Sequence, residues 1–309
     1  MHRFRLNHTR SDTVYAQSSK LKPEPNRFTR YRQSMGFSAT LTIIFWLGLA
    51  EAVRSDAVTV RINRWLTVQQ FTGAVSYLQS GESRSARQGD RLQNVGDGVT
   101  TDKGASAELE IDTQIGTVEV AEDTQLAIQT LEITPSDGRI TRLRVDRGRV
   151  RLQVRTFTNP DSRLEIETPA GVSGVRGTDF GLVVQPDGKM GVATLEGNVV
   201  TEAQTQAVEV SAGFQNITVP GEPPSAPVPF TNEPRLDYQI ERTIKRGVRR
   251  IRLAGQVDPT STVLYKGEPQ ILDRDGSFAL LFPARSRLKV QITVVTPLGR
   301  TQTYDLDLI

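Results

Sequence analysis

The sequence predicts an all-β protein, and three observations lead to this prediction. Between residues 57 and 219, apolar and polar residues alternate in short runs such as AELEID, GTVEVA and GRVRLQV, and clusters of Gly, Asp, Asn or Pro separate the runs. Such alternation places the apolar side chains on one face of a strand. No long stretch of this region has the 3.6-residue spacing that is typical of an amphipathic helix. Residues 248–309 return to the same alternation after a proline-rich interval.

The first 52 residues have the composition of an export signal. Residues 1–34 carry eight Lys or Arg against two acidic residues, and an uncharged apolar run over residues 35–50 follows. Ala50 and Ala52 then form an A-x-A site, so cleavage is expected after Ala52. The apolar run is shorter than the ~20 residues that span a bilayer comfortably. The sequence therefore predicts export to the periplasm or cell envelope. The alternative is an uncleaved signal-anchor that forms one N-terminal transmembrane segment.

The charge and the rare residue types exclude several classes of function. The whole chain has a net charge of +3, and the leader's eight basic and two acidic residues contribute +6. The remainder is therefore slightly acidic and predicts no nucleic-acid partner. The chain has no Cys, and its two His residues, His2 and His8, lie in the leader. This excludes a Ser-His-Asp triad, cysteine catalysis and histidine metal ligands from the rest of the chain.

Beyond the leader, the sequence predicts two β modules and a linker. The first module covers residues 57–219, and residues 220–247 form the linker. Six prolines in residues 220–234 indicate an extended, semi-rigid chain. The basic segment that follows, RLDYQIERTIKRG at 235–247, is amphipathic and predicts one or two helical turns. Residues 248–309 predict a small β-sandwich.

Several motifs of the first module occur in a characteristic order. They are GDRLQNVGDGVTTDKGASAELEI (89–111), GRVRLQV (148–154), IETPAGVSGVRGTDFGL (166–182), VATLEGNVV (192–200) and VEVSAG (208–213). This order resembles the FecR-type domain of bacterial envelope proteins, over residues 71–215. The resemblance implies an extracytoplasmic β-sandwich or roll of many short strands.

The resemblance does not extend to the whole of the family's signalling members. The family is named after a membrane-spanning regulator of ferric dicitrate uptake, and its signalling members carry a helical, tryptophan-containing anti-sigma segment before their span. Here residues 1–34 precede the apolar run and contain no tryptophan, so a sigma-factor partner is not predicted. The C-terminal module is similar to small Ig-like domains of envelope proteins, through VLYKGEPQILDRDGSFALLFP at 263–283.

The VRGTDF stretch predicts a structural turn between two strands. Proline ends a strand because it has no N–H, and glycine supplies backbone freedom. A pair between Arg176 and Asp179 is expected to close the turn, with Thr178 as a cap. A ligand-binding role for Arg176 is the alternative. The residues assigned to the turn are Thr168, Pro169, Gly174, Arg176, Gly177, Thr178 and Asp179.

A dense group of arginines gives the second candidate site. Alternation is expected to place them on one face of two adjacent strands joined near residues 146–148, as a cationic surface for an anionic ligand. The alternative is a ladder of ion pairs with Glu108, Glu110, Asp112 and Glu119 on neighbouring strands. The arginines are Arg142, Arg144, Arg149, Arg151 and Arg155.

These features together predict a non-enzymatic protein of the bacterial cell envelope. Its FecR-type domain is expected to act as an extracytoplasmic binding or scaffolding module for an envelope protein or for an anionic glycan, cell-wall or lipid surface. The alternative is a single-span FecR-like signalling regulator. No catalytic residue, metal site or cofactor is predicted. Glu122 and Asp123 are adjacent, so on a strand they would be expected to point to opposite sides. LDRDGS at 272–277 lacks the downstream glutamate of a calcium loop.

Overall fold

Both predicted modules consist of strands. The computed structural model describes residues 64–245, 248–284 and 288–308, and these residues form strands and turns with no helix. The prediction of an all-β fold is confirmed. Within these ranges there is consequently no helix long and apolar enough to cross a membrane. The predicted leader, with its cleavage residues Ala50 and Ala52, lies outside the described residues.

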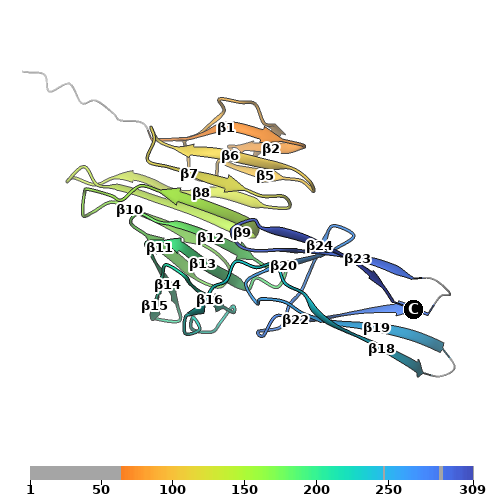
Figure 1. Ribbon diagram of the computed structural model, residues 1–309. Helices are drawn as coiled ribbons and strands as arrows, with labels where there is room; N and C mark the ends of the chain where they lie inside the picture. The colour runs from red at the N-terminus through yellow and green to blue at the C-terminus, as the bar shows by residue number, and fades with distance from the viewer. Residues whose placement is uncertain (1–63, 246–247, 285–287, 309) are drawn as a thin grey trace, which may run out of the picture. The chain divides into compact units, whose positions relative to one another are not determined.

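The first module is built from two sheets that share one long strand (Figure 1). Across the first sheet lie β4 (Arg91–Leu92), β1 (Leu66–Thr72), β6 (Ser106–Ile111), β7 (Gly116–Val120), the second half of β9 (Arg139–Val154), β12 (Asp179–Val184), β13 (Met190–Glu196), β16 (Phe214–Thr218) and β17 (Val228–Pro229). Across the second lie β3 (Glu82–Ser85), β2 (Val75–Gln79), β5 (Gly98–Thr101), β8 (Gln125–Ile133), the first half of β9, β10 (Arg163–Glu167), β11 (Val172–Val175), β14 (Asn198–Ala203) and β15 (Gln206–Ser211).

Successive hairpins alternate between the two sheets. The hairpin β6–β7 belongs to the first sheet, β10–β11 to the second, β12–β13 to the first and β14–β15 to the second. Strand β9 crosses from one sheet to the other at Gly148, which has a φ of 96°. A Cβ at this position would lie 2.5 Å from the Cα of Thr124. Glycine therefore provides both the backbone angle and the space for the crossing.

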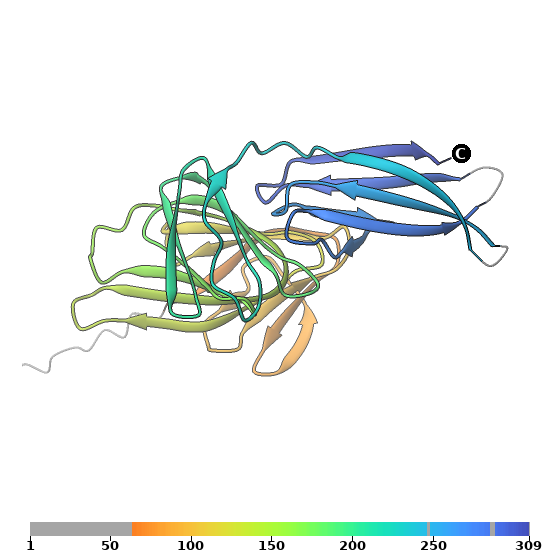
Figure 2. The same cartoon turned by 90° about the horizontal axis from the view of Figure 1, so that it is seen from below.

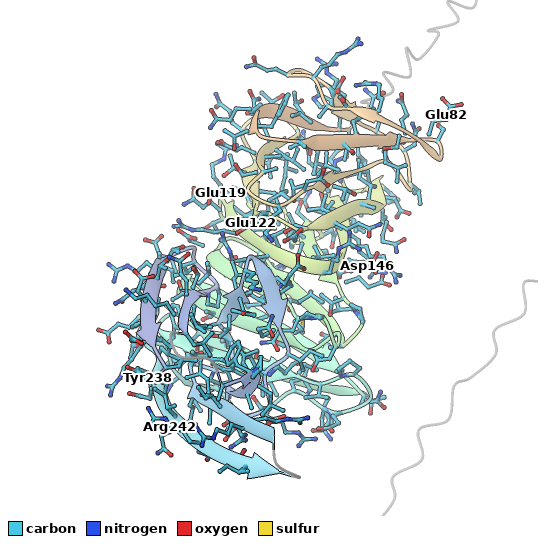
Figure 3. The ribbon with its side chains drawn as sticks, turned by 90° about the vertical axis from the view of Figure 1, so that its right-hand side faces the viewer. Glu82, Glu119, Glu122, Asp146, Tyr238 and Arg242 are labelled. Carbon is cyan, nitrogen blue, oxygen red and sulfur yellow. The ribbon has the colours of Figure 1, made fainter. Side chains whose placement is uncertain are left out.

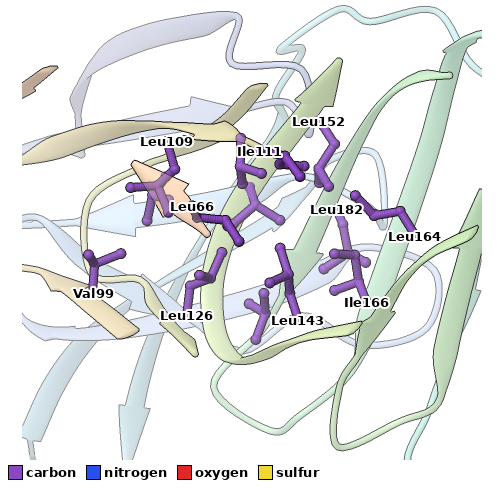
Figure 4. Close-up of a cluster of buried hydrophobic side chains, with 14 of the residues drawn as sticks. Leu66, Val99, Leu109, Ile111, Leu126, Leu143, Leu152, Leu164, Ile166 and Leu182 are labelled. Carbon is purple, nitrogen blue, oxygen red and sulfur yellow. The ribbon is translucent and has the colours of Figure 1, made fainter. Parts of the chain in front are cut away.

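The core of the first module lies between the two sheets. Leu109 and Leu152 from the first sheet meet Leu126 and Leu143 from the second, and all four are almost fully buried (Figure 4). Their polar neighbours in sequence, such as Glu108, point outward because side chains alternate along a strand. Burying each large aliphatic side chain contributes about 1.5–3 kcal/mol to folding.

The C-terminal module consists of a three-stranded and a four-stranded sheet (Figure 2). The first contains β18 (Asp237–Lys245), β19 (Val248–Gln256) and β22 (Ser277–Pro283), and the second contains β21 (Glu268–Gln270), β20 (Thr262–Tyr265), β23 (Lys289–Val295) and β24 (Thr301–Asp307). Its core includes Leu253, Ile292 and Phe282, and the Phe282 ring meets the Tyr265 ring edge to face at 5.6 Å.

The prediction of helical turns in residues 235–247 is wrong, because residues 237–245 of this segment form β18. Leu236, Ile240 and Ile244 are four residues apart, as in a helix, whereas Leu236, Tyr238 and Ile240 alternate as in a strand. Strand β19 offers a backbone partner along the whole length of β18, so sheet pairing decides between the two patterns.

Part of the proline-rich segment is also held against the first module. Strand β17 pairs with β16, and the backbone N–H of Ser225 donates to the carbonyl oxygen of Ile217 at 2.9 Å. The described residues up to the end of the C-terminal module belong to one compact unit.

Candidate functional site

The VRGTDF stretch and the residues before it form two connections with a short strand between them. In the first connection, the hydroxyl of Thr168 accepts hydrogen bonds from the backbone N–H groups of Ala170 and Gly171, both at 3.2 Å. The N–H of Thr168 itself donates to the carbonyl of Gly171 at 2.9 Å. Thr168 thus caps the turn that contains Pro169, and β11 follows directly, with Gly174 inside it.

In the second connection, two glycines permit a close approach of the backbone. Gly177 has a φ of 143°, and a Cβ there would lie 2.4 Å from the Cα of Thr156. Gly197, in the LEGNVV motif, has a φ of 77°, and its Cβ would lie 2.5 Å from the carbonyl oxygen of Gly177. The two motifs therefore contact each other through glycines that packing requires. Gly174 differs, since its Cβ would meet nothing nearer than 3.9 Å.

The expected pair between Arg176 and Asp179 does not form. Asp179 instead accepts two hydrogen bonds from Arg151, at 3.0 Å and 2.8 Å, and these bonds raise the pKa of the Arg151 guanidinium. Arg176 is exposed and has no ion pair with any described residue. The expected cap is also wrong, because the hydroxyl of Thr178 is buried without a hydrogen-bond partner.

The five arginines do not form one surface. The two adjacent strands expected around residues 146–148 are a single strand, β9, whose halves lie in different sheets. Arg142 and Arg144 therefore lie on the outer face of the second sheet, and Arg149 and Arg151 on the outer face of the first. Figure 3 shows the consequence. Asp146, which pairs with Arg144, lies on the opposite side of the module from Glu119, which stands opposite Arg151 in the sheet register.

Three of the five arginines are ion-paired. Arg142 pairs with Glu165, Arg144 with Asp146 and Glu167, and Arg151 with Asp179. Most of these partners lie on β10 and β12. The alternative of an ion-pair ladder required partners on β6, and none of the three arginines pairs with a β6 residue. Asp112 is instead buried against Arg64 at 2.9 Å. Arg155 is exposed, and Arg149 is half-buried with no ion pair among the described residues.

A cavity of about 340 Å³ lies where the first module meets the C-terminal module, and we call it the junction cavity. The bend of β9 and the β7–β8 turn contribute one wall, which contains Arg149, Glu122 and Asp123. The end of β12 and the strands β20, β21 and β23 close the other side. In Figure 3, Glu119 and Glu122 lie on the side of the first module that faces these C-terminal strands. No pattern in the sequence predicted this site.

The electrostatics of the junction cavity are mixed. Burial lowers the pKa of the Arg149 guanidinium, since desolvation outweighs the attraction of Glu119 and Glu122. Burial also raises the pKa of Asp123, and the nearby carboxylates of Glu122 and Glu268 act in the same direction. Across the described residues, no three His, Cys, Asp or Glu side chains come together as a metal site.

Comparison with known proteins gives one family match and a few distant structural neighbours. A family model described as "FecR protein" matches residues 97–200, and no curated protein matches the sequence. Two crystal structures of a "putative anti-sigma factor" from Parabacteroides distasonis ATCC 8503 have TM-scores of 0.36 and 0.35 and identities of 16% and 14%. Each alignment covers 42% of this chain and 58% of that chain. A polysaccharide lyase aligns with a TM-score of 0.18 and 12% identity, over 77% of this chain and 39% of that chain.

The chain thus spans little more than half the length of the anti-sigma factor structures, and similarities this low carry no argument about function. The family match is independent of them. It includes the TPAGVSGVRGTDF stretch and ends in the LEGNVV motif, the two motifs whose glycines meet in the structure. Residues 97–200, which run from β5 into β14, are a FecR domain.

Proposed function

We propose that this chain is a non-enzymatic protein of the bacterial cell envelope, in which the FecR domain and the C-terminal module together act as an extracytoplasmic binding unit. The observation that carries this proposal is the junction between the two modules. Its buried side-chain hydrogen bonds hold them as one body, and a cavity remains between them. The described residues contain no histidine or cysteine, which supports a binding role over a catalytic one.

The junction uses polar groups that seldom lie buried without partners. Lys189 is only 2% exposed, and its ammonium donates to the carbonyl oxygens of Leu272 and Asp273 at 2.9 Å and 2.8 Å. The amide of Gln185 donates to the carbonyl oxygens of Pro259 and Ser261, both at 3.3 Å. Each pair satisfies donors and acceptors that would otherwise cost about 1–3 kcal/mol when buried.

Strands β12 and β13 also bring glycines to this junction. A Cβ at Gly181 would lie 2.3 Å from the carbonyl oxygen of Pro297, and one at Gly191 would lie 3.0 Å from the Cα of Thr260. The backbones of the two modules therefore touch. Such contact favours a rigid unit over two modules that move freely on a linker.

An anionic glycan, wall polymer or lipid surface remains the predicted class of macromolecular ligand. Fewer arginines support this class than the sequence indicated, because Arg142, Arg144 and Arg151 already have carboxylate partners. Substituting Arg149 and Arg155 with Gln tests this class directly. Unchanged retention on cell-wall or anionic-lipid preparations, with the fold intact, would exclude these two arginines as the contact.

A second candidate function is a single-span regulator that senses outside the membrane and signals inward. The sequence feature that favours it is the apolar run 35–50, which directly follows a basic segment. In this case the FecR domain would be the sensing part, and residues 1–34 would meet a cytoplasmic partner.

The mature N-terminus distinguishes the two candidates. The full-length protein would be recovered from the envelope fraction and its intact mass measured, and intact cells and spheroplasts would be treated with protease. A chain that begins at Val53 and is degraded only in spheroplasts supports the exported binding unit. A membrane-bound chain that retains residues 1–52 supports the regulator. A protein found only in the cytoplasm contradicts both.

A further inference from the structure

Arg149 differs from the other arginines that the structure describes. Those that are not exposed each form a salt bridge through the guanidinium, as Arg64 does with Asp112 and Arg151 with Asp179. Arg149 is half-buried, and its guanidinium has neither a hydrogen bond nor an ion pair with any described residue. A guanidinium removed from water without a partner is unfavourable, so this position needs an explanation.

The backbone fixes Arg149 at the cavity wall. Its N–H donates to the hydroxyl of Thr124 at 3.0 Å, and its carbonyl accepts from the N–H of Ala121 at 3.0 Å. The side chain extends toward the turn between β23 and β24. There its Nη1 lies 3.1 Å from the point that a Gly299 Cβ would occupy. A side chain at Gly299 would therefore displace the guanidinium, and glycine leaves it room at this turn.

The rest of the junction cavity divides into an apolar wall and an acidic rim. Val184, Leu264 and Val295 contribute to the apolar wall, and Glu122, Asp123 and Glu268 form the rim. The rim is partly neutralised, because Lys103 lies 3.4 Å from Glu268, and Glu122 accepts a hydrogen bond from the N–H of Gly104 at 2.7 Å. The exposed Arg147 also lines the cavity. A volume of about 340 Å³ is near the lower end of the range for small-molecule sites, about 300–1,000 Å³.

We propose that the junction cavity binds a small molecule with one carboxylate and an apolar body, with the carboxylate on Arg149. A guanidinium presents two parallel N–H donors that match a carboxylate, and a planar bidentate pair of this kind is strong where water is excluded. The apolar wall accommodates the body of the ligand. The acidic rim repels a second negative charge, so the site selects monocarboxylates over dicarboxylates and polyphosphates. The proposal rests on the binding unit proposed above, because the cavity requires both modules.

The test uses matched probes on the purified full-length chain. Isothermal titration would measure binding of phenylacetate, its neutral analogue phenylacetamide, and benzylamine, and the same three comparisons would be made with hexanoate, hexanamide and hexylamine. We expect the carboxylates to bind and the amides and amines to bind at least tenfold more weakly. Arg149→Gln should weaken carboxylate binding about 10- to 100-fold, the value of losing hydrogen bonds to a charged group. Arg250→Gln removes the same charge from an exposed position on β19, outside the cavity lining, and should leave the affinity unchanged.

A second variant keeps the test decisive if Arg149→Gln disturbs the junction. Leu264→Trp narrows the cavity from the other side without changing its charge, and it should also abolish binding. Equal binding of acids and amides, retained affinity in Arg149→Gln, or no binding of either carboxylate would overturn the proposal. Preference for the amines would also overturn it, since the acidic rim would then be the ligand group. The mature N-terminus is measured separately, so these results leave the export prediction standing.

Discussion

At the scale of single residues, the glycines of the FecR domain differ in what the structure requires of them. Gly177→Ala would place a Cβ 2.4 Å from the Cα of Thr156 at a φ of 143°, so the backbone must shift. We expect a loss of at least about 1–3 kcal/mol in the free energy of unfolding. Gly174→Ala, three residues earlier, meets only the Cγ of Glu165 at 3.9 Å. It should change stability by less than about 1 kcal/mol. Urea unfolding of both variants measures the difference, and equal losses would show that Gly177 is not a packing residue.

Asp90 makes a contribution to stability that depends on pH. Its carboxylate accepts hydrogen bonds from Arg84 at 2.7 Å and 2.8 Å, which lower its pKa, and another from the N–H of Arg87 at 2.7 Å. A pKa that is lower in the folded state stabilises the protein above the unfolded pKa of about 3.9, and this stabilisation is lost as the pH falls through the folded value. The melting temperature of Asp90→Asn should therefore fall less than that of the wild type as the pH is lowered. Arg84→Gln should do the same, and the double variant should resemble either single variant. Additive effects would contradict this assignment.

At the scale of elements, the sequence predicted most strands but not how β9 joins them. The alternating runs gave the core positions correctly, because one face of each strand is buried. The sequence of β9 also carries a signal of this crossing. The buried positions are odd-numbered at Leu143 and Val145 and even-numbered at Val150 and Leu152. A change of phase within one alternating run requires a bend or a bulge, and Gly148 lies at this change. Recognising it would have separated the arginines into two groups.

This crossing leads to a prediction about the element as a whole. Gly148→Ala would force a Cβ to within 2.2 Å of the Thr124 hydroxyl. That hydroxyl accepts the N–H of Arg149 and donates to the carbonyl of Glu122 at 3.0 Å. We expect the free energy of unfolding to fall by at least about 1–3 kcal/mol. We also expect faster amide hydrogen exchange at Arg149 and Val150. Gly213→Ala is the matched control for the φ alone, since it has a φ of 82° and nothing within 4 Å of its Cβ. A smaller loss in Gly148→Ala than in Gly213→Ala would contradict the crossing described here.

At the scale of the whole molecule, the sequence did not predict that the two modules share a buried junction. The proline-rich segment indicated a linker, and a linker does not show whether the two modules that it joins pack against each other. The sequence of β12 nevertheless carries a signal of this junction. The residues FGLVV form a continuous apolar run, and both Leu182 and its neighbour Val183 are buried. A strand buried on both faces needs a layer on each side, and the C-terminal module supplies the second layer. Which surface would cover this run depends on tertiary contacts between Gly181 and Pro297, which no local pattern encodes.

Lys189 tests whether the two modules unfold as one body. Met lacks only the terminal ammonium position, so Lys189→Met keeps most of the side chain but removes both hydrogen bonds to the carbonyl oxygens of Leu272 and Asp273. We expect a loss of about 1–3 kcal/mol in the free energy of unfolding. Calorimetry should show one transition for the wild type and two for Lys189→Met. The Leu272 amide, which donates to Gln185 at 3.4 Å, should exchange faster. Lys289→Met removes an exposed lysine from β23 and serves as the control.

The same lysine sets a pH dependence whose sign follows from its surroundings. Burial lowers the pKa of Lys189, although Asp187 and Asp273 oppose this shift. Between the lowered folded pKa and the ordinary lysine pKa, the unfolded chain binds more protons than the folded one, so stability increases with pH in this window. Lys189→Met should lack this increase, and Lys289→Met should retain it. A wild-type stability that falls as the pH rises across this window would contradict the lowered pKa of Lys189. A Lys189→Met variant that melts in one transition at the temperature of the control would mean that Lys189 does not couple the two modules.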